Sequence, residues 1–311
     1  MVPSCHIYFC CNNAEYARHY VVLMASILAN LAKGARASFH LIYSGLSQRD
    51  LDAFTQMKRY RDCDVDFIQI KESDFSQWNQ TAGIKHLTVG AYYRIKIPEL
   101  APSDIARAVY FDGDIIVDGD ILPLWEIDLK GYCAGVVFNG PDNLKKTKPD
   151  DDYFNSGMIV FNLDEIRKGN FKQEVEAAYA ASATSGFGDL DQGLLNATWK
   201  GRVRFLPFRW NVQTACLKIK NRFKYDLWTH LKHPVVLHYT GGHKAWSPRC
   251  KNALWRKYFK YLALTPYRMS TVAYGVFRLQ RLRYRLYSVE PLGDRKWRIQ
   301  FLFFFQITVK V

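Results

Sequence analysis

The first part of the chain alternates short β-rich runs with segments of helical periodicity. Strands are predicted at 7–11, 37–43, 65–70, 108–111 and 115–117, and helices at 15–32 and 47–60. Strands that alternate with helices imply a parallel sheet, and such sheets bind ligands at the carboxyl ends of their strands. An α/β protein is therefore predicted, with Asn12 at one of these strand ends. Further strands are predicted near 133–138, 158–161 and 235–239, and helices near 164–182 and 190–199.

Charge is distributed unevenly along the 311 residues. Residues 1–199 carry 19 basic and 26 acidic side chains, whereas residues 200–311 carry 24 basic and 3 acidic ones. The formal net charge of +14 is thus −7 in the first part and +21 in the second. Such asymmetry indicates an anionic partner or surface for the basic part. The apolar content of 49% excludes wholesale disorder.

The sequence predicts neither a membrane span nor a disulfide framework. The longest uncharged apolar stretches, 20–32 and 301–309, are shorter than the ~20 residues that cross a bilayer. No basic region followed by an apolar region precedes the first strand, so no secretory signal is visible. The 7 cysteines are odd in number and lack CxxC spacing, which favours reduced thiols over disulfides or structural zinc. A cytoplasmic protein is predicted.

The triplet Asp112-Gly113-Asp114 directly follows the apolar strand at 108–111. In a simple strand the two carboxylates would face the same side and could converge on one Mg²⁺ or Mn²⁺ ion, which prefer oxygen ligands. An isolated Asp-x-Asp is more often a solvated loop, but its position at a strand end favours the metal site here. Asp118 and Asp120 repeat the spacing without a preceding strand, and we interpret them as turn residues.

His238 ends another apolar strand and is followed by Gly241, Gly242 and Lys244. Glycines let backbone approach a ligand closely, and a Gly-rich turn with a lysine is a common way to bind phosphate. A lone histidine at a strand end is more often a hydrogen-bonded structural residue. The sequence nevertheless offers no third metal ligand more plausible than His238.

Six segments together carry a resemblance to glycosyltransferase family 8, whose members are retaining enzymes with the GT-A fold. They are residues 9–13, 86–96, 112–114, 154–157, 191–196 and 238–246, and the similarity extends over about 5–262. The family includes bacterial lipopolysaccharide galactosyl- and glucosyltransferases and, more distantly, glycogenin. The resemblance implies a Rossmann-like, mainly parallel central sheet flanked by helices. We expect this GT-A domain at 1–265 and a basic aromatic extension at 266–311.

The resemblance also implies a metal site and a donor. In the family, the Asp-x-Asp carboxylates and the strand-end histidine hold Mn²⁺ against the diphosphate of a UDP-sugar, a role that falls on Asp112, Asp114 and His238; Mg²⁺ is a possible substitute. Gly241 and Lys244 match the phosphate contacts. The metal and the lysine would neutralise the departing UDP, so no protonated carboxylic acid is needed at the leaving group.

The remaining matched positions bind the donor. The residues that match donor-contacting positions are Cys10, Asn12, Tyr16, Arg94, Asp112, Gly113, Asn155 and Ser156, and the catalytic positions are Asp191 and Gln192. Gln192 matches the residue on the face of the anomeric carbon opposite the leaving group. An amide is a poor nucleophile, so front-side attack through an oxocarbenium-like transition state is favoured over a stable covalent intermediate.

Two positions depart from the family pattern. Asn12 stands where many relatives carry a carboxylate that accepts the N3–H of uracil; its amide oxygen can accept the same bond. Gly193 stands where bacterial relatives often carry a second acid, and this form resembles glycogenin-like members. His86 is expected to face the acceptor.

Residues 266–311 combine nine basic and two acidic side chains with ten aromatic ones. Leu279, Leu282 and Leu286 share one stripe at helical spacing, and Arg278, Arg281 and Arg285 lie on the adjoining face. A solvated basic face packed on the domain is one interpretation, and nucleic-acid binding is another, although no nucleic-acid-binding module is recognisable. We favour the membrane interface, where arginines attract anionic lipid and aromatic rings lie at headgroup depth. The rings in question are Trp297, Phe301, Phe303, Phe304 and Phe305.

The sequence as a whole thus predicts a retaining hexosyltransferase that moves galactose or glucose from a UDP-sugar to a glycan. The expected acceptor is lipopolysaccharide core or another lipid-linked oligosaccharide, reached from the inner face of the cytoplasmic membrane, with an anionic membrane surface and no nucleic acid among the partners. One alternative is a glycogenin-like self-glucosylating protein. Another is a non-catalytic lipid- or nucleic-acid-binding module with a decayed site, which only Asn12 and Gly193 support.

Overall fold

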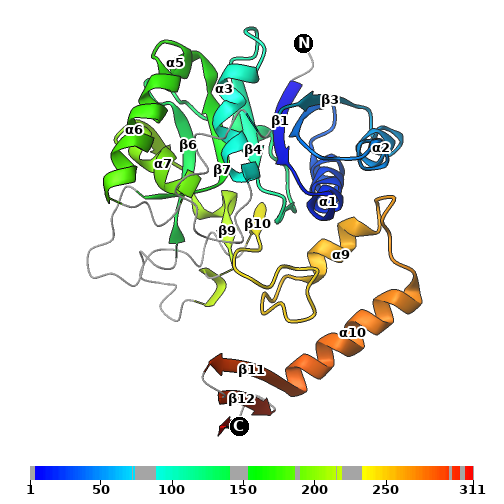
Figure 1. Ribbon diagram of the computed structural model, residues 1–311. Helices are drawn as coiled ribbons and strands as arrows, with labels where there is room; N and C mark the ends of the chain where they lie inside the picture. Colours follow the sequence, from blue (N-terminus) through cyan, green and yellow to red (C-terminus); the bar gives the residue numbers. More distant parts are fainter. Residues whose placement is uncertain are drawn as a thin grey trace.

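A seven-stranded sheet in the order β3-β2-β1-β4-β7-β6-β8 forms the centre of the protein (Figure 1). The computed structural model describes residues 4–71, 73, 89–140, 153–185, 190–214, 216–218, 233–293, 296–301 and 305–310. The strands of the large sheet are β1 (Ser4–Cys11), β2 (Arg36–Tyr43), β3 (Cys63–Gln69), β4 (Arg107–Phe111), β6 (Ala134–Phe138), β7 (Phe154–Asn162) and β8 (Val203–Phe205). All neighbouring strands run parallel except β7, which is antiparallel to β4 and β6. The predicted α/β class is confirmed.

Helices cover the large sheet because alternate residues of its strands are apolar on both faces. Ile7 and Phe9 of β1 belong to one core cluster, whereas Tyr8 and Cys10 belong to another on the opposite face. The helical elements are α1 (Ala14–Asn30), α2 (Gln48–Gln56), η1 (Met57–Arg59), η3 (Val89–Lys96), α3 (Ile97–Leu100), η4 (Leu122–Trp125), α5 (Leu163–Arg167), α6 (Phe171–Ser185), α7 (Leu190–Thr198), η5 (Phe208–Trp210), η6 (Cys216–Lys218), α9 (Arg256–Leu262) and α10 (Thr271–Leu286).

Side-chain caps explain where the first two helices begin. The Asn13 side chain accepts a hydrogen bond from the Glu15 amide at 2.7 Å, and Ser47 and Asp50 form a capping box at the start of α2. The predicted helices at 15–32 and 47–60 are therefore present, the second with its last turn as the 3₁₀ element η1.

A second, three-stranded sheet lies beside the large one and extends it toward the C-terminal part. Its order is β5 (Ile115–Val117), β10 (Val236–His238) and β9 (Val212–Gln213), with β10 antiparallel to β5 and parallel to β9. Apolar side chains from this sheet, α1 and α9 form a separate core cluster. The chain thus returns, more than 110 residues later, to pair with the strand that follows the Asp-x-Asp triplet.

Two predicted elements differ from the structure. The helix predicted near 164–182 is two helices, α5 and α6, because Gly169 and Asn170 interrupt it and Asn170 begins the second one by accepting from the amide of Gln173. The strand predicted near 158–161 begins four residues earlier, at Phe154.

The C-terminal segment begins with α10, the predicted basic helix. Its inner side packs on α9: the Phe277 ring lies 4.6 Å from that of Phe259, and the Tyr274 ring lies 5.3 Å from it. Three antiparallel strands that were not predicted follow, β11 (Tyr287–Gly293), β12 (Lys296–Phe301) and β13 (Phe305–Lys310). The aromatic part of the membrane prediction rests on Trp297, Phe301, Phe303, Phe304 and Phe305, and the side chains of these residues lie outside the described ones. Of the helices in the described residues, none has both the length and the apolar character to cross a membrane.

All seven cysteines of the chain are buried and free of disulfides. Burial raises the pKa of the Cys5 and Cys11 thiols to about 12. These thiols therefore act as small apolar side chains of the core.

Candidate active site

Asp112 and Asp114 lie in a turn that joins the two sheets. β4 ends at Phe111, β5 begins at Ile115, and the Ile115 amide donates to the Asp112 carbonyl at 3.2 Å. The triplet thus lies in a turn and not in the simple strand considered from the sequence, because the chain changes sheets at Gly113. The carboxylates converge for a different reason: the turn is held between Gly157 of β7 and Tyr239, whose backbone atoms bond to Asp112 and Asp114 at 2.8 and 2.9 Å.

His238 reaches these carboxylates because β10 pairs with β5 and places it opposite Ile115. Its Nε2 lies 3.1 Å from Asp114 Oδ1 and 3.9 Å from Asp112 Oδ2. Within the described residues these three side chains form the one group of candidate ligands for a metal ion, with ligand atoms within 4.8 Å of one another. Two carboxylates and an imidazole at this separation form a donor set that a divalent cation can occupy.

Lys244 completes the charge pattern at Asp114. Its Nζ lies 2.5 Å from Asp114 Oδ2, and the Asp114 side chain is nearly buried. Burial acts to raise the pKa of Asp114, but His238 and Lys244 outweigh it and hold the pKa below its usual range. Gly241, the other predicted phosphate contact, lies in the exposed turn after β10 with φ of +91°, a conformation that favours glycine.

Arg94 lies on the other side of Asp112 and joins it to Asp191. The guanidinium is 2.9 Å from Asp112 Oδ1 and 3.2 Å from Asp191 Oδ2, and only 7% of Arg94 is exposed. Burial alone would lower the pKa of Arg94, but the two carboxylates hold it well above its usual value. Burial raises the pKa of Asp191, and Arg94 opposes that rise. Arg94 also stacks on Tyr110, which donates to Asp112 at 2.5 Å.

A widened region of β7 presents Asn155 and Ser156 to α7. Val136 of β6 pairs with Ile159 of β7, but the next residue, Val137, pairs with Asn155. Three residues of β7, 156–158, are therefore extra between these two pairs. Gln192, in the first turn of α7, uses its Oε1 to accept from the Ser156 amide and from Asn155 Nδ2, both at 3.1 Å. Ser156 Oγ donates to Asp191 at 3.3 Å.

Asn211 connects this region to His238 and was not predicted from the sequence. Its Nδ2 donates to Asn155 Oδ1 at 2.9 Å, and its Oδ1 lies 3.0 Å from His238 Nδ1. Asn211 has no exposed surface, and it lies between η5 and β9 in a segment with no recognisable motif. Only the pairing of β9 with β10 brings it to the site.

Two backbone N–H groups determine the orientation of a series of three side-chain amides, those of Gln192, Asn155 and Asn211. The Ser156 amide must donate to Gln192 Oε1, and the Gly157 amide must donate to Asn155 Oδ1 at 3.1 Å. Asn155 therefore presents its oxygen to Asn211 Nδ2, and Asn211 presents its own oxygen to His238. The hydrogen-bond network thus places a proton on His238 Nδ1, so Nε2 is the ring nitrogen that faces the carboxylates and could bind a metal ion.

Gly157 makes room for the convergence of the three candidate ligands. A Cβ at this position would lie 2.3 Å from His238 Cε1 and 2.7 Å from Asp112 Oδ2, closer than atoms can approach. A side chain at 157 would therefore displace the imidazole or the carboxylate.

The predicted nucleotide-contacting residues surround the other end of the site. Tyr16 contacts Trp246 edge-on, and a Cβ at Gly113 would lie 3.1 Å from the Tyr16 ring. Cys10 is buried, and its carbonyl accepts from Tyr20 at 2.7 Å. Asn12 packs its amide against Gly90, where a Cβ would lie 2.5 Å from Asn12 Oδ1. His86, the predicted acceptor-facing residue, lies outside the described residues.

Comparison with known proteins identifies the class of enzyme. Residues 6–250 match the profile of glycosyl transferase family 8. The protein is thus a glycosyltransferase, an enzyme that takes a sugar from a nucleotide-sugar donor to a glycan acceptor. It belongs to glycosyltransferase family 8, and the resemblance found in the sequence is confirmed.

Two relatives and one solved structure show how far the likeness extends. The chain is 30% identical over 276 residues to general stress protein A of Bacillus subtilis, covering 84% of this chain and 93% of that protein. It is 24% identical over 229 residues to a lipopolysaccharide 1,2-glucosyltransferase of Escherichia coli, covering 62% and 68%. The crystal structure of the galactosyltransferase LgtC with donor and acceptor sugar analogues superposes with a TM-score of 0.71 at 22% identity, covering 87% of this chain and 99% of that one. The predicted GT-A fold is confirmed.

Proposed function

We propose that the protein is a divalent-metal-dependent, retaining hexosyltransferase that uses UDP-glucose or UDP-galactose. The observation that carries this proposal is the convergence of Asp112, Asp114 and His238 beside Lys244, at the strand ends where α/β enzymes bind their ligands. Mn²⁺ fits this donor set, and Mg²⁺ fits its carboxylates. When bound, the ion would stabilise negative charge on the diphosphate leaving group.

The formal charge of the site supports the need for a cation. Asp112, Asp114 and Asp191 contribute three negative charges, and Arg94 and Lys244 contribute two positive ones. The net charge of −1 would repel a diphosphate, whereas a divalent cation would change it to +1. Lys244 and the N–H groups of the turn that contains Gly241 would then hold the phosphates.

The contacts of Gln192 support front-side attack over a covalent enzyme intermediate. Its Oε1 already accepts from the Ser156 amide and from Asn155, so its electron pairs are held by two donors. An amide oxygen in this arrangement is a poorer nucleophile still. We assign Gln192 and Asp191 to the donor sugar, with Asp191 accepting from sugar hydroxyls and Arg94 holding its carboxylate in place.

We further propose a glycan acceptor on a lipid carrier, such as lipopolysaccharide core, met at the inner face of the cytoplasmic membrane. The relative named as a lipopolysaccharide 1,2-glucosyltransferase supports this acceptor class. Residues 1–265 would form the GT-A domain and 266–311 the membrane-associating part. The exposed apolar side chains of α10 support that division, with Val272 77% and Leu279 67% exposed.

The test is UDP release from UDP-glucose and UDP-galactose with and without Mn²⁺, with proton NMR of the product to give the anomeric configuration. Asp114→Asn should remove metal-dependent turnover, whereas Asp52→Asn, an exposed aspartate on α2, should not. Turnover that is independent of metal, or unchanged in Asp114→Asn, would sink the metal assignment. Hexose found on a tyrosine of the enzyme by mass spectrometry would favour the glycogenin-like alternative.

A further inference from the structure

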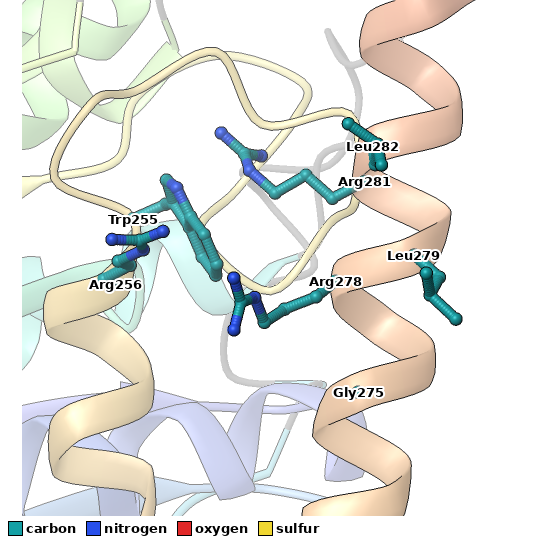
Figure 2. Close-up of a pocket in the computed structure, with 7 residues that line it drawn as sticks. All are labelled: Trp255, Arg256, Gly275, Arg278, Leu279, Arg281 and Leu282. Atoms are coloured by element: carbon teal, nitrogen blue, oxygen red, sulfur yellow. The ribbon is translucent and has the colours of Figure 1, made fainter.

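A groove of about 440 Å³ separates α10 from the start of α9, far from the Asp112 turn in the chain (Figure 2). Trp255 lies at its base, and Arg256, Arg278 and Arg281 surround that ring. Figure 2 shows Arg278 and Arg281 extending from α10 toward Trp255 and Arg256. None of the residues that line the groove is acidic.

The fold holds Arg281 in place. Arg281 has its guanidinium carbon 4.4 Å from the centre of the Trp255 ring and donates to the carbonyls of Pro248 and Cys250 at 3.3 and 2.5 Å. It is only 4% exposed. Arg256 approaches the same indole at 5.5 Å. Two guanidinium groups therefore share one aromatic ring, an arrangement that a bound anion would stabilise.

The sequence provides no carboxylate from either wall. Residues 227–289 contain no aspartate or glutamate, and this range includes α9, α10 and the segment between them. Twelve lysines and arginines lie in the same range. The groove is consequently a concentrated positive site, and arginine is the side chain best suited to bind phosphate oxygens.

Apolar side chains continue the groove onto the outer surface of α10. Leu279 and Leu282 line it and are 67% and 52% exposed. The helix buries Phe277 against α9, so its packing requirement inside the protein is already met on the other side. Guanidinium groups next to exposed leucines suit a ligand that has a phosphate at one end and alkyl chains at the other.

We propose that this groove binds the phosphate of an anionic lipid headgroup, with the lipid chains lying against Leu279 and Leu282. The proposal rests on the membrane association in the proposed function and specifies the site that reads the headgroup. A nucleic acid suits the groove less well, because Arg281 stacks on Trp255, the only aromatic ring among the lining residues, and no platform is left for a base.

The test is sedimentation of the full chain with vesicles of phosphatidylcholine alone or mixed with phosphatidylglycerol. Arg278→Gln and Arg256→Gln should each weaken partition onto the mixed vesicles about fivefold, because each basic residue near an anionic surface contributes about that factor. Gly275→Leu should weaken it similarly without changing charge, since a Cβ at Gly275 meets no atom within 4 Å and the side chain would fill the groove. Arg268→Gln, an exposed arginine that does not line the groove, is the matched control.

The outcomes distinguish lipid binding in the groove from membrane association elsewhere on the protein and from binding of other anions. Binding of mixed vesicles that falls in the three groove variants but not in Arg268→Gln supports the proposal. If every variant binds the mixed vesicles as well as the unaltered protein does, the groove proposal is overturned and membrane association is left standing. Groove variants that lose binding to a single-stranded oligonucleotide or to inorganic phosphate, but keep vesicle binding, also overturn it. UDP release in the absence of vesicles should be unchanged in every variant, so failure of the proposed chemistry is detected independently.

Discussion

Replacing Asn211 with leucine should weaken Mn²⁺ binding without altering any proposed ligand. Asn211 is fully buried and makes hydrogen bonds of 2.9 Å to Asn155 and 3.0 Å to His238. Leucine is close in volume but removes both partners, so the Nδ1–H of His238 is left without an acceptor in the core. The unfolding free energy should fall by about 1–3 kcal/mol, the cost of one buried unsatisfied donor.

The effect on metal binding follows from the same contact. A partner that orients a metal-binding histidine is typically worth about 10- to 100-fold in metal affinity. Without Asn211 the imidazole can rotate or exchange its proton to Nε2, the atom that lies 3.1 Å from Asp114. We therefore expect Mn²⁺ affinity to fall about 10- to 100-fold in Asn211→Leu.

Titration of free Mn²⁺ by electron paramagnetic resonance measures this affinity, and nitrogen NMR of labelled histidine reports the tautomer of the metal-free protein. Asn162→Ala is the control, because Asn162 bonds to Leu129, Tyr132 and the start of α5 at the opposite end of β7. It should lose similar stability and keep Mn²⁺ affinity. Equal Mn²⁺ affinity in Asn211→Leu and Asn162→Ala would refute the reasoning that the amide series orients His238.

Three further predictions address the site and the core. Gly157→Ala should abolish measurable Mn²⁺ binding in the same titration, because its Cβ would lie 2.3 Å from His238, whereas Gly135→Ala meets only leucine methyl groups at 3.2 Å or more and should bind normally. Arg94→Met should lower the unfolding free energy in urea by about 3–5 kcal/mol, because it leaves the buried Asp191 and the half-buried Asp112 without their counter-ion, and Asp191→Asn added to it should recover part of the loss. Burial lowers the pKa of His19 to about 3, below its value in the unfolded chain, so the unfolded state gains a proton first as the pH falls. The contribution of His19 to the free energy of unfolding should be constant above pH 7 and should fall below about pH 6.5, by about 2 kcal/mol at pH 5. The decrease in unfolding free energy with pH should be smaller in His19→Gln, and equal pH dependence in the two proteins would contradict the assignment.

The sequence was most informative where local pattern and tertiary structure agree. The predicted strands at 7–11, 37–43 and 65–70 became β1, β2 and β3, because apolar β-rich runs with polar ends have few other ways to bury their side chains. Asp112 and Asp114 follow an apolar strand and His238 ends another; the family resemblance assigns all three to one metal site, and the structure brings them together.

The reasons for that convergence were not available from the sequence. Periodicity says which face of a strand a residue occupies, but not that the chain leaves one sheet for another at Gly113. Asn211 was missed for the same reason: it acts through the pairing of β9 with β10, a contact that no local pattern records. Strands β11 to β13 are not predicted either, because their aromatic and basic residues are equally typical of a surface that binds lipid.

The assembly of the site from two sheets bears on how the protein is made. The last strand of the large sheet ends at Phe205, so all seven of its strands are synthesised before His238 and Lys244 leave the ribosome. A nascent chain of that length contains every strand of the central sheet together with Asp112 and Asp114, yet it has neither His238 nor Lys244 to place beside them. The proposed metal ion and donor could therefore stabilise the fold only after the chain has been extended to Lys244. A chain released before residue 238 would lack the imidazole and the ammonium group that the proposed chemistry needs.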